Sequence, residues 1–448
     1  MSYKLTKLPT SPIIFAAMPK VEIKTIQSND ADRWDEYVYS NPKATLYHLY
    51  GWQNVINKTY GHKTYYLMAI QDNPTNSTNP INPMNSSNPT NPSNPMNSSN
   101  PTSPTNPMNS SNPTNPIVGI LPLVHLKHFL FGNSLISIPF FDLGGVLAND
   151  EETEKTLLSK TIELAQKLKV NTIELRHTEP LSCLNPINPT NSTNPTNSTN
   201  PMNPTNPSNP SNPTNSTNST NPMNPITHKT RSHKLRMLLN LPDSSETLMQ
   251  SFKSKLRSQI KRPVKEGLYS KIGSLELLED FYRVFLIKMK DLGSPVHSRS
   301  LIQNVLEEFP DKAKIVVIYK DHIPIASSLI AGFNNTLENP WASALRKYSN
   351  LSPNMLLYWT MLKYACDNGF AFFDFGRSSE DEGTYKFKEQ WGAKPSQLYW
   401  HYLFLNGQKV NQETHEKSKF EKAIQYWQKL PLSATRILGP MIRKHIGL

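Results

Sequence analysis

The chain has 448 residues, of which 38 are proline and 37% are hydrophobic, and its formal net charge is +12. This positive charge favours an anionic partner such as a nucleic acid, a nucleotide-linked sugar or a lipid headgroup, but selects none of them. The two cysteines, Cys183 and Cys366, exclude a disulfide framework, have no metal-ligand spacing and are not expected to act as nucleophiles. The apolar run near the N-terminus is too short for a signal peptide, and no later segment has the roughly eighteen apolar residues of a membrane span, so a soluble, cytoplasmic protein is expected.

Two charge-free blocks rich in Asn, Pro, Ser and Thr interrupt the chain, at about residues 73–116 and 185–226. The first repeats NPMNSS at positions 82, 94 and 106. Such segments have too few large apolar side chains to offset the entropy of ordering them, so we expect disorder. We interpret them as insertions in surface loops, where added length costs little free energy. A role as spacers or adhesive arms is the alternative.

Outside these blocks, the predicted elements form two similar series. YYLMAIQDN and PIVGILPLVHL, on either side of the first block, predict two strands, so that the block replaces a hairpin turn. Residues 160–179 predict an amphipathic helix and a strand that ends at Arg176. Residues 314–333 predict a hairpin with a tight turn, and residues 361–380 predict a helix, a stop at Gly369 and a strand that ends at Arg377.

This order of elements is typical of an α/β (α+β) fold with helices packed on mixed, mostly antiparallel sheets. We expect an N-terminal extension over residues 1–20, a first domain over 21–230, a second domain over 231–408 and a helical tail over 409–448. The tail alternates cations with apolar residues, namely Trp427, Leu430, Leu438 and Ile442. We expect a simple surface tail, and peripheral contact with the inner face of an anionic membrane is the alternative.

Several cationic or polar positions are candidate sites. In SFKSKLRSQIKRPVKEG, residues 251–267, a helix places Arg257 and Lys261 on one face, which suits a phosphate. The alternative is a solvated helix face, and Pro263 is expected to break or kink this helix. Ser352 is a natural N-cap, and the free N–H groups of the helix that it begins suit a phosphate or carboxylate, although an ordinary capped helix has the same pattern.

Three histidines are considered as site residues, one as a proton acceptor and two as metal ligands. His297 lies in a turn after a long helix and is a candidate proton acceptor, although a lone histidine is more often a structural hydrogen-bonding group. His125 and His128 lie three residues apart in an extended segment, which places them on opposite faces. No metal site is therefore expected there.

FFDFGRSSEDEGTYKFKEQWGAKP, residues 372–395, is the most informative stretch. A strand brings Asp374 to the end of a sheet, Arg377 emerges at the loop, and Lys388 follows on a segment anchored by Phe387 and Trp391. Cations aimed at one point stabilise an oxyanion or a phosphate. The tripeptide DFG is not accompanied by the Gly-rich and His-Arg-Asp loops of protein kinases, which excludes that class.

Five segments resemble one known family: KLRSQIKRPVKEG, GSPVHSRS, PWASALR, SPNMLLYW and TYKFKEQWGAKP. They are similar to FemAB-like proteins associated with exopolysaccharide and PEP-CTERM/exosortase gene clusters, whose second half is a BioF2-like, GNAT-type acyltransferase domain. FGNSLISIPFFDLGGVLA, residues 131–148, resembles the first half of this family. The resemblance implies two tandem GNAT-like domains and transfer of an acyl or aminoacyl group to an amine or hydroxyl.

The resemblance also implies residue roles. The family's Phe-Lys motif matches Phe387 and Lys388, so Lys388 is expected to polarise the reacting carbonyl or neutralise the oxyanion. Arg377 is expected to share this task, with Asp374 orienting one of the two cations. The residues expected to bind substrates are Arg257, Lys261, Arg346, Ser352, Asn354, Tyr385, Lys386 and Trp391.

No tightly bound cofactor is expected, and the donor is an acyl-CoA or an aminoacyl-tRNA. Residues 275–310 read as two ordinary helices and leave no room for the helical arm of bridge-forming FemAB enzymes, which weighs against tRNA. The Arg-x-x-Gly-x-Gly/Ala loop that holds coenzyme A is missing before residue 353, which weighs against acyl-CoA. The expected acceptor is an anionic nucleotide- or lipid-linked sugar of a cell-envelope polysaccharide or peptidoglycan. The rival hypothesis is a non-catalytic protein that binds RNA or a glycan in the same basic cleft.

Overall fold

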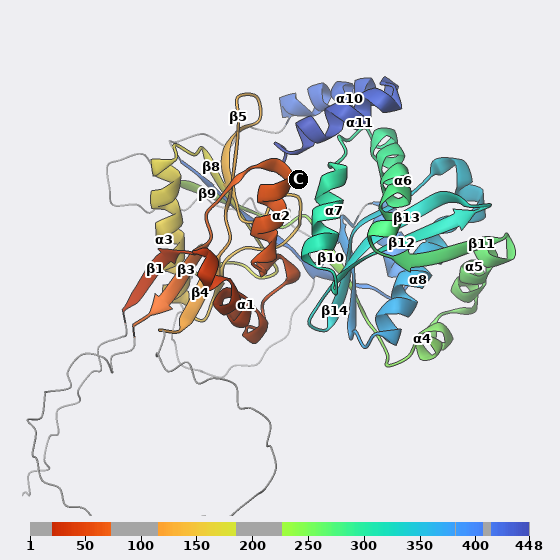
Figure 1. Ribbon diagram of the computed structural model, residues 1–448, viewed down its shortest axis with the longest axis horizontal. Coiled ribbons are helices and arrows are strands. Elements are labelled where there is room, and N and C mark those ends of the chain that lie inside the picture. Colours follow the sequence, from red (N-terminus) through yellow and green to blue (C-terminus); the bar gives the residue numbers. More distant parts are fainter. Residues whose placement is uncertain (1–19, 73–114, 185–225, 381, 406–413, 448) are drawn as a thin grey trace, which may run out of the picture.

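The computed structural model describes residues 20–72, 115–184, 226–380, 382–405 and 414–447. The predicted disorder of the two insertions concerns residues that lie outside these ranges. The described residues form two α/β domains with mixed sheets flanked by helices, as the sequence predicts (Figure 1). No helix within the described ranges has the length and apolar character needed to cross a bilayer.

The first domain contains two sheets. The strands of the first sheet are, in order, β1 (Val21–Thr25), β3 (Leu67–Gln71), β4 (Ile117–Leu121) and β7 (Leu147–Ala148). The strands of the second are β2 (Lys63–Thr64), β5 (Val124–His128), β6 (Gly132–Ile136), β8 (Thr172–His177), β17 (Tyr399–Phe404) and β9 (Thr227–Arg231). The helices are α1 (Ala31–Ser40), α2 (Gly51–Tyr60) and α3 (Glu151–Lys167). Strands β3 and β4 pair antiparallel, which confirms that the first insertion joins the two strands of a hairpin.

The second domain is built on one seven-stranded sheet. Its strands are, in order, β11 (Leu268–Gly273), β12 (Ala313–Lys320), β13 (Ile323–Phe333), β14 (Thr336–Ala344), β15 (Phe372–Ser378), β10 (Leu235–Asn240) and β16 (Lys394–Gln397). Its helices are α4 (Ser245–Ser251), α5 (Ser254–Lys265), α6 (Leu278–Asp291), α7 (Arg299–Glu308), α8 (Pro353–Asp367) and α9 (Gly383–Glu389). Short 3-10 turns occur at Ser28–Asp30, Leu46–His48, Ser182–Leu184, Leu275–Leu277 and Arg346–Leu351, the last of which is η6.

Local sequence explains most of these elements. The β12–β13 hairpin turns at Asp321 and His322, whose φ angles of 50° and 66° are those that a two-residue hairpin loop requires. Helix α8 ends before Gly369, whose φ of 75° is left-handed, as the predicted stop requires. Pro263 lies inside α5, and the helix continues for two residues beyond it, so the expected break does not occur at the proline itself.

A strand exchange links the domains. Strand β16 lies in the sheet of the second domain, whereas β17 enters the first domain and pairs with β8 on one edge and β9 on the other. In this register, Trp400 lies opposite Arg176. Residues 399–404 thus fall within the range expected for the second domain, but they hydrogen-bond in the first. The sequence did not predict this exchange, because pairing between such distant segments leaves no local sequence signal.

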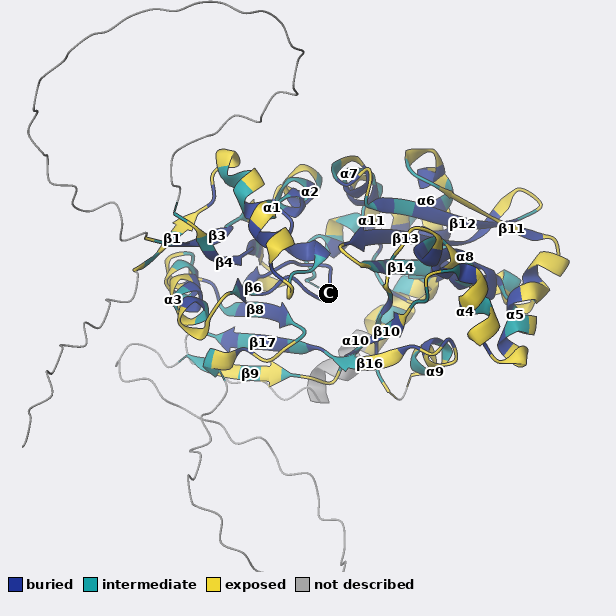
Figure 2. Ribbon diagram, turned by 90° about the horizontal axis from the view of Figure 1, so that it is seen from below, coloured by how far each residue is buried: buried dark blue, intermediate teal, exposed yellow. Residues whose placement is uncertain are grey.

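One hydrophobic core continues across the domain interface. Trp52 on α2 packs against Phe309 with ring centroids 5.1 Å apart, and Phe141 packs against Trp341 at 5.3 Å. A Cβ on Gly51 would lie 2.8 Å from the Phe309 ring, so only glycine allows this close approach of α2 and the end of α7. Burial of each such aromatic side chain contributes about 1.5–3 kcal/mol. The two domains are therefore held in a fixed relation. Figure 2 shows buried strands in both of them.

The C-terminal tail is not a simple surface segment. Its helices, α10 (Thr414–Lys429) and α11 (Leu432–Arg443), lie along the top of Figure 1. Beyond α11, the main-chain oxygen of Lys444 contacts His62 Nε2 at 2.7 Å, and that of Gly447 accepts a hydrogen bond from the Phe140 N–H. From the second domain, Lys290 on α6 donates to the main-chain oxygen of Gln428 in α10 at 2.7 Å. The tail thus contacts both domains.

Candidate active site between the domains

Strands β14 and β15 open a space in the second sheet. They pair in parallel only from Thr336 opposite Phe372 to Glu338 opposite Asp374. Beyond these positions, β14 continues beside β13 and β15 continues beside β10, so the two strands diverge. A cavity of about 990 Å³ lies at this divergence and is lined by both strands, residues 140–143 of the first domain and the tail.

The cavity has two kinds of lining. Its charged side chains come from the second sheet, α9 and the first-domain loop, and they include Asp142, Arg236, Glu338, Asp374, Arg377 and Lys388. One set of large apolar side chains comes from α6, the tail and the β5–β6 turn, namely Phe131, Met289, Leu292, Ile424, Trp427, Ile442 and Ile446. Others come from the elements that also carry the charges, and they include Phe140, Phe141, Trp341 and Phe375. The apolar side chains of α6, the tail and the β5–β6 turn, which carry none of these six charges, suit an apolar part of a ligand.

Helix α9 positions Lys388. Phe387 packs edge-on against Tyr358 at 5.0 Å, and Trp391 is fully buried in the core, so both act as the predicted anchors. The Lys388 ammonium is buried and donates to the main-chain oxygens of Gly376 at 3.0 Å and Arg377 at 2.8 Å. An ammonium has three N–H groups, so one is left for a substrate oxygen. Burial lowers the pKa of Lys388 to about 8, even though Asp374 and Asp142 favour its charged form.

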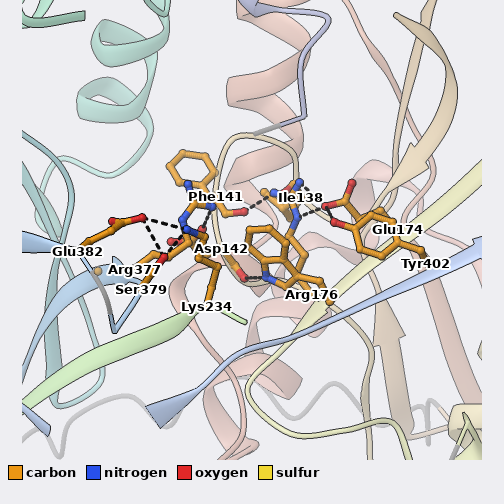
Figure 3. Close-up of polar contacts among 12 residues, drawn as sticks. Ile138, Phe141, Asp142, Glu174, Arg176, Lys234, Arg377, Ser379, Glu382 and Tyr402 are labelled. Atoms are coloured by element: carbon orange, nitrogen blue, oxygen red, sulfur yellow. Dashed lines mark hydrogen bonds and ion pairs between the residues drawn. The ribbon is translucent and has the colours of Figure 1, made fainter. Parts of the chain in front are cut away.

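Arg377 lines the same cavity from the end of β15. Its Nη1 donates to Asp142 Oδ1 of the first domain at 2.8 Å (Figure 3). Its guanidinium also lies over the ring of Trp400, 5.2 Å from the ring centroid. The structure thus brings Arg377 and Lys388 to one cavity, with Arg377 held by residues of the first domain's sheet and loop.

Asp374 pairs with a cation that the sequence did not suggest. Its Oδ2 accepts from Arg236 Nε at 2.5 Å, and its Oδ1 accepts from the Gly376 N–H at 2.8 Å. Within hydrogen-bond distance it pairs with neither Arg377 nor Lys388 in the described structure, contrary to expectation. A register shift between Arg236 and Leu238 places Arg236 opposite Arg377 and within reach of Asp374. Asp374 therefore makes no direct hydrogen bond to Lys388, and it acts on this side chain through its charge and through the Gly376 backbone.

Glu338 is a site residue that the sequence analysis missed. It lies beside Asp374 in the sheet and lines the cavity. Burial, and next the charge of Asp374, raise its pKa to about 8, while Arg236 acts in the opposite direction. Its Oε1 atom is buried and has no hydrogen-bond partner among the described residues. An acidic residue within a strand just before PWASALR was the only signal in the sequence.

His297 has a structural position. The ring is fully buried, Nε2 accepts from Arg443 Nε at 3.0 Å, and Nδ1 lies 3.3 Å from the Tyr60 hydroxyl. Burial and the Arg443 charge hold the pKa of His297 well below its usual range. Both ring nitrogens are engaged, so the expected role as proton acceptor does not fit. His297 instead anchors the tail through Arg443.

The remaining predicted residues lie away from the cavity. Trp391 is buried, Tyr385 packs against the core, and Lys386 is exposed. Arg257 and Lys261 lie on α5, and Arg346, Ser352 and Asn354 lie on η6 and at the start of α8. Arg262 of α5 joins these segments by donating to the main-chain oxygen of Asn350 at 3.2 Å. Ser352 is the N-cap residue but makes no side-chain capping hydrogen bond.

The cysteines are unpaired, and burial raises the pKa of Cys183 to about 12 and that of Cys366 to about 11. Both thiols are therefore protonated at neutral pH. Neither has the low pKa that a nucleophilic cysteine needs.

Known proteins are similar to this chain in fold. Residues 250–389 match the model of the family described as acetyltransferase (GNAT) domain. The solved structure of FemX is 13% identical, with a TM-score of 0.51, over 85% of this chain and 96% of FemX. A tandem GNAT protein from the clavulanic acid biosynthesis pathway is 9% identical, with a TM-score of 0.43, over 87% of this chain and 100% of that protein. No curated protein sequence matches. Residues 250–389 thus have the pattern of a GNAT domain, and the two-domain chain has a fold similar to that of FemX.

Proposed function

We propose that this protein is an acyl- or aminoacyltransferase that modifies a cell-envelope polysaccharide, a peptidoglycan or a nucleotide- or lipid-linked precursor, and that it acts in the cytoplasm or at the inner membrane face. The observation that supports it most is the convergence of Lys388, Arg377 and Glu338 on one cavity where β14 and β15 diverge. The match of residues 250–389 to the GNAT family supports acyl transfer in general. The resemblance to exopolysaccharide-associated FemAB-like proteins supports an envelope acceptor.

The proposed reaction is attack of an acceptor amine or hydroxyl on the donor carbonyl. The Glu338 carboxylate accepts the proton of the nucleophile, and the free N–H of Lys388, with the Arg377 charge, stabilises the oxyanion. A C–N or C–O bond forms, and the C–S bond of an acyl-CoA or the C–O ester bond of an aminoacyl-tRNA breaks. The leaving thiol or ribose hydroxyl takes up the proton.

The proposed places of the substrates follow from the chemistry of each surface. Phosphate groups are common to both donors and to the anionic acceptors. The helix start at Pro353, with Arg346 on the preceding turn and Arg262 of α5 in contact with Asn350, suits such groups. The apolar lining from α6 and the tail suits the lipid of a lipid-linked acceptor. We therefore favour a lipid-linked sugar over a free nucleotide sugar.

A transfer assay tests the proposal. The full chain is incubated with envelope precursors and either a labelled acyl-CoA or a labelled aminoacyl-tRNA, and label in the acceptor is measured. In parallel, envelope polysaccharide from cells with and without the protein is compared by mass spectrometry. We expect transfer from one donor and a matching mass difference. Binding of RNA or glycan, with no transfer from either donor and no mass difference, would instead establish the rival binding function.

A further inference from the structure

Helix α11 buries small or polar residues and exposes several large apolar ones. Thr435, Gly439 and Arg443, spaced four residues apart, are buried against the protein. On the opposite face, Ile437 is 66% exposed and Met441 is 60% exposed. In a helix that packs only on its own protein, the apolar face lies inward. An outward apolar face therefore indicates a second, apolar environment.

The tip of the β5–β6 hairpin also exposes large apolar side chains. Phe129 is 88% exposed, Leu130 is 71% exposed and Phe131 is 45% exposed, and they are consecutive. Single exposed apolar residues are common, whereas a contiguous group that includes two phenylalanines marks an interaction surface.

The tip and the tail belong to one surface. The His445 ring, just after α11, lies 4.2 Å from that of His128 and stacks near Phe131 at 6.3 Å, as measured between centroids. Figure 1 shows the β5–β6 turn and helices α10 and α11 along the same edge of the molecule. Phe131 and Ile442 also line the cavity, so this surface adjoins the apolar side of the candidate site.

The charge of the segments that form this surface is mostly positive, with the exposed Glu421 of α10 at their border. The segment from residue 422 to residue 447 contains no acidic residue, and neither does the segment from residue 124 to residue 141. The cations in these segments, apart from the buried Arg443, are Lys127, Lys422, Lys429, Arg436 and Lys444. Two copies of such a surface repel each other. Exposed apolar side chains on segments that also carry cations instead match the interface of an anionic bilayer, where the rings and aliphatic groups enter the headgroup boundary and the cations contact phosphates.

We infer that the β5–β6 tip and α11 form a docking surface for an anionic membrane. Phe129, Leu130, Ile437 and Met441 insert into the bilayer interface, and the surrounding cations bind its headgroups. The apolar side of the cavity then faces the membrane. This inference deepens the proposed function by naming the surface that contacts the membrane, and its test is independent of transfer activity, because docking needs neither donor nor acceptor.

Vesicle sedimentation tests it with the full chain. We expect the chain to sediment with vesicles of phosphatidylcholine and phosphatidylglycerol, and at least tenfold less with phosphatidylcholine alone. The fourfold variant Phe129→Ser, Leu130→Ser, Ile437→Ser and Met441→Ser should lose at least tenfold in binding with an unchanged melting temperature, because these side chains are exposed. The charge variant Lys127→Gln with Arg436→Gln should bind less and depend less on salt.

The matched control changes exposed apolar residues elsewhere. Val264, Ile272 and Ile323 are 57%, 39% and 42% exposed on α5, β11 and β13, and their replacement by Ser should leave vesicle binding unchanged. Absence of sedimentation, equal losses in the control and the fourfold variant, or unchanged binding of the fourfold variant would each overturn the inference. So would a concentration-dependent dimer in light scattering that the fourfold variant abolishes, because a second copy would then occupy the surface.

Discussion

Arg176 of the first domain and Arg377 of the second lie against the same indole ring, that of Trp400, with guanidinium carbons 5.4 Å and 5.2 Å from its centroid. Each arginine lies near the end of the corresponding strand of its domain, β8 or β15. Arg176 is buried and paired with Glu174 at 2.7 Å, whereas Arg377 pairs with Asp142 and lines the cavity (Figure 3). Of the two matching positions, the first thus serves the domain interface and the second faces the candidate site.

Trp400 should therefore be important for stability as well as for the position of Arg377. We expect Trp400→Leu to lower the free energy of unfolding by roughly 2–4 kcal/mol, because it leaves a space in the interface and removes both cation–π contacts. Urea denaturation measures this change. Trp400→Phe keeps an aromatic face and should lose less than half as much, and equal losses would show that the cation–π contacts contribute little.

Lys388→Met should lower kcat by about 10²–10³-fold, because it removes a charged donor at the position assigned to the oxyanion. Steady-state kinetics of the transfer reaction measure the loss, and acceptor binding should change much less. The matched control is Lys386→Met on the same helix. Lys386 is exposed and outside the described cavity lining, so its loss should leave kcat nearly unchanged. A larger effect at residue 386 than at residue 388 would contradict the site assignment.

Glu338 and Lys388 should together produce a bell-shaped activity profile around pH 8. Activity rises with pH as Glu338, with a pKa of about 8, becomes a carboxylate, and it falls as Lys388, also with a pKa of about 8, loses its charge. Glu338→Gln should lower kcat by about 10²–10⁴-fold and remove the rising limb. Glu382→Gln, which changes another carboxylate of the cavity, should keep both limbs. A rising limb that persists in Glu338→Gln would assign it to another group.

Glu338 should also affect the pH dependence of stability. Its pKa is about 8 in the folded chain against an ordinary value of 4.5, so the folded state binds this proton more tightly. The contribution of this pKa shift to the free energy of unfolding is present in full below the pKa of the unfolded chain. It is lost as pH rises through the pKa of the folded chain, at about 1.4 kcal/mol per pH unit. Urea denaturation across this window should show a decline that Glu338→Gln reduces. An identical decline in the variant would show that Glu338 is ionised at neutral pH.

Buried histidines should make the protein sensitive to acid. Burial lowers the pKa of His48 and His401 to about 4, and holds the pKa values of His177 and His297 well below 6.5. Below pH 6.5 these histidines take up protons in the unfolded chain but not in the folded one. The free energy of unfolding therefore falls, as the pH is lowered, by about 1.4 kcal/mol per pH unit for each ring. His297→Gln should lessen this slope in urea titrations. It should also increase hydrogen exchange in α11, which Arg443 ties to His297.

Local sequence patterns were sufficient to predict most of the helices and strands and part of the candidate site. The hairpin, helix and strand of each half, the β12–β13 turn and the Phe387 and Trp391 anchors depend on neighbours in sequence, and the structure has them as predicted. The pairings of Asp374 with Arg236 and of Arg377 with Asp142 join residues 138 and 235 positions apart. Such pairs depend on strand order and on a register shift, which a single sequence does not encode locally. Glu338 was missed because only the divergence of β14 and β15 places it in a cavity.

The position of β17 also constrains how the protein is made. The strand lies between β8 and β9, which are not otherwise paired with each other, and it comes near the end of the chain. During synthesis, the first domain emerges from the ribosome with two open strand edges, and they close only after the second domain has been translated. Exposed edges of this kind are the segments at which nascent chains aggregate or exchange strands. Production of the intact chain should therefore depend strongly on chaperones that protect it until translation ends.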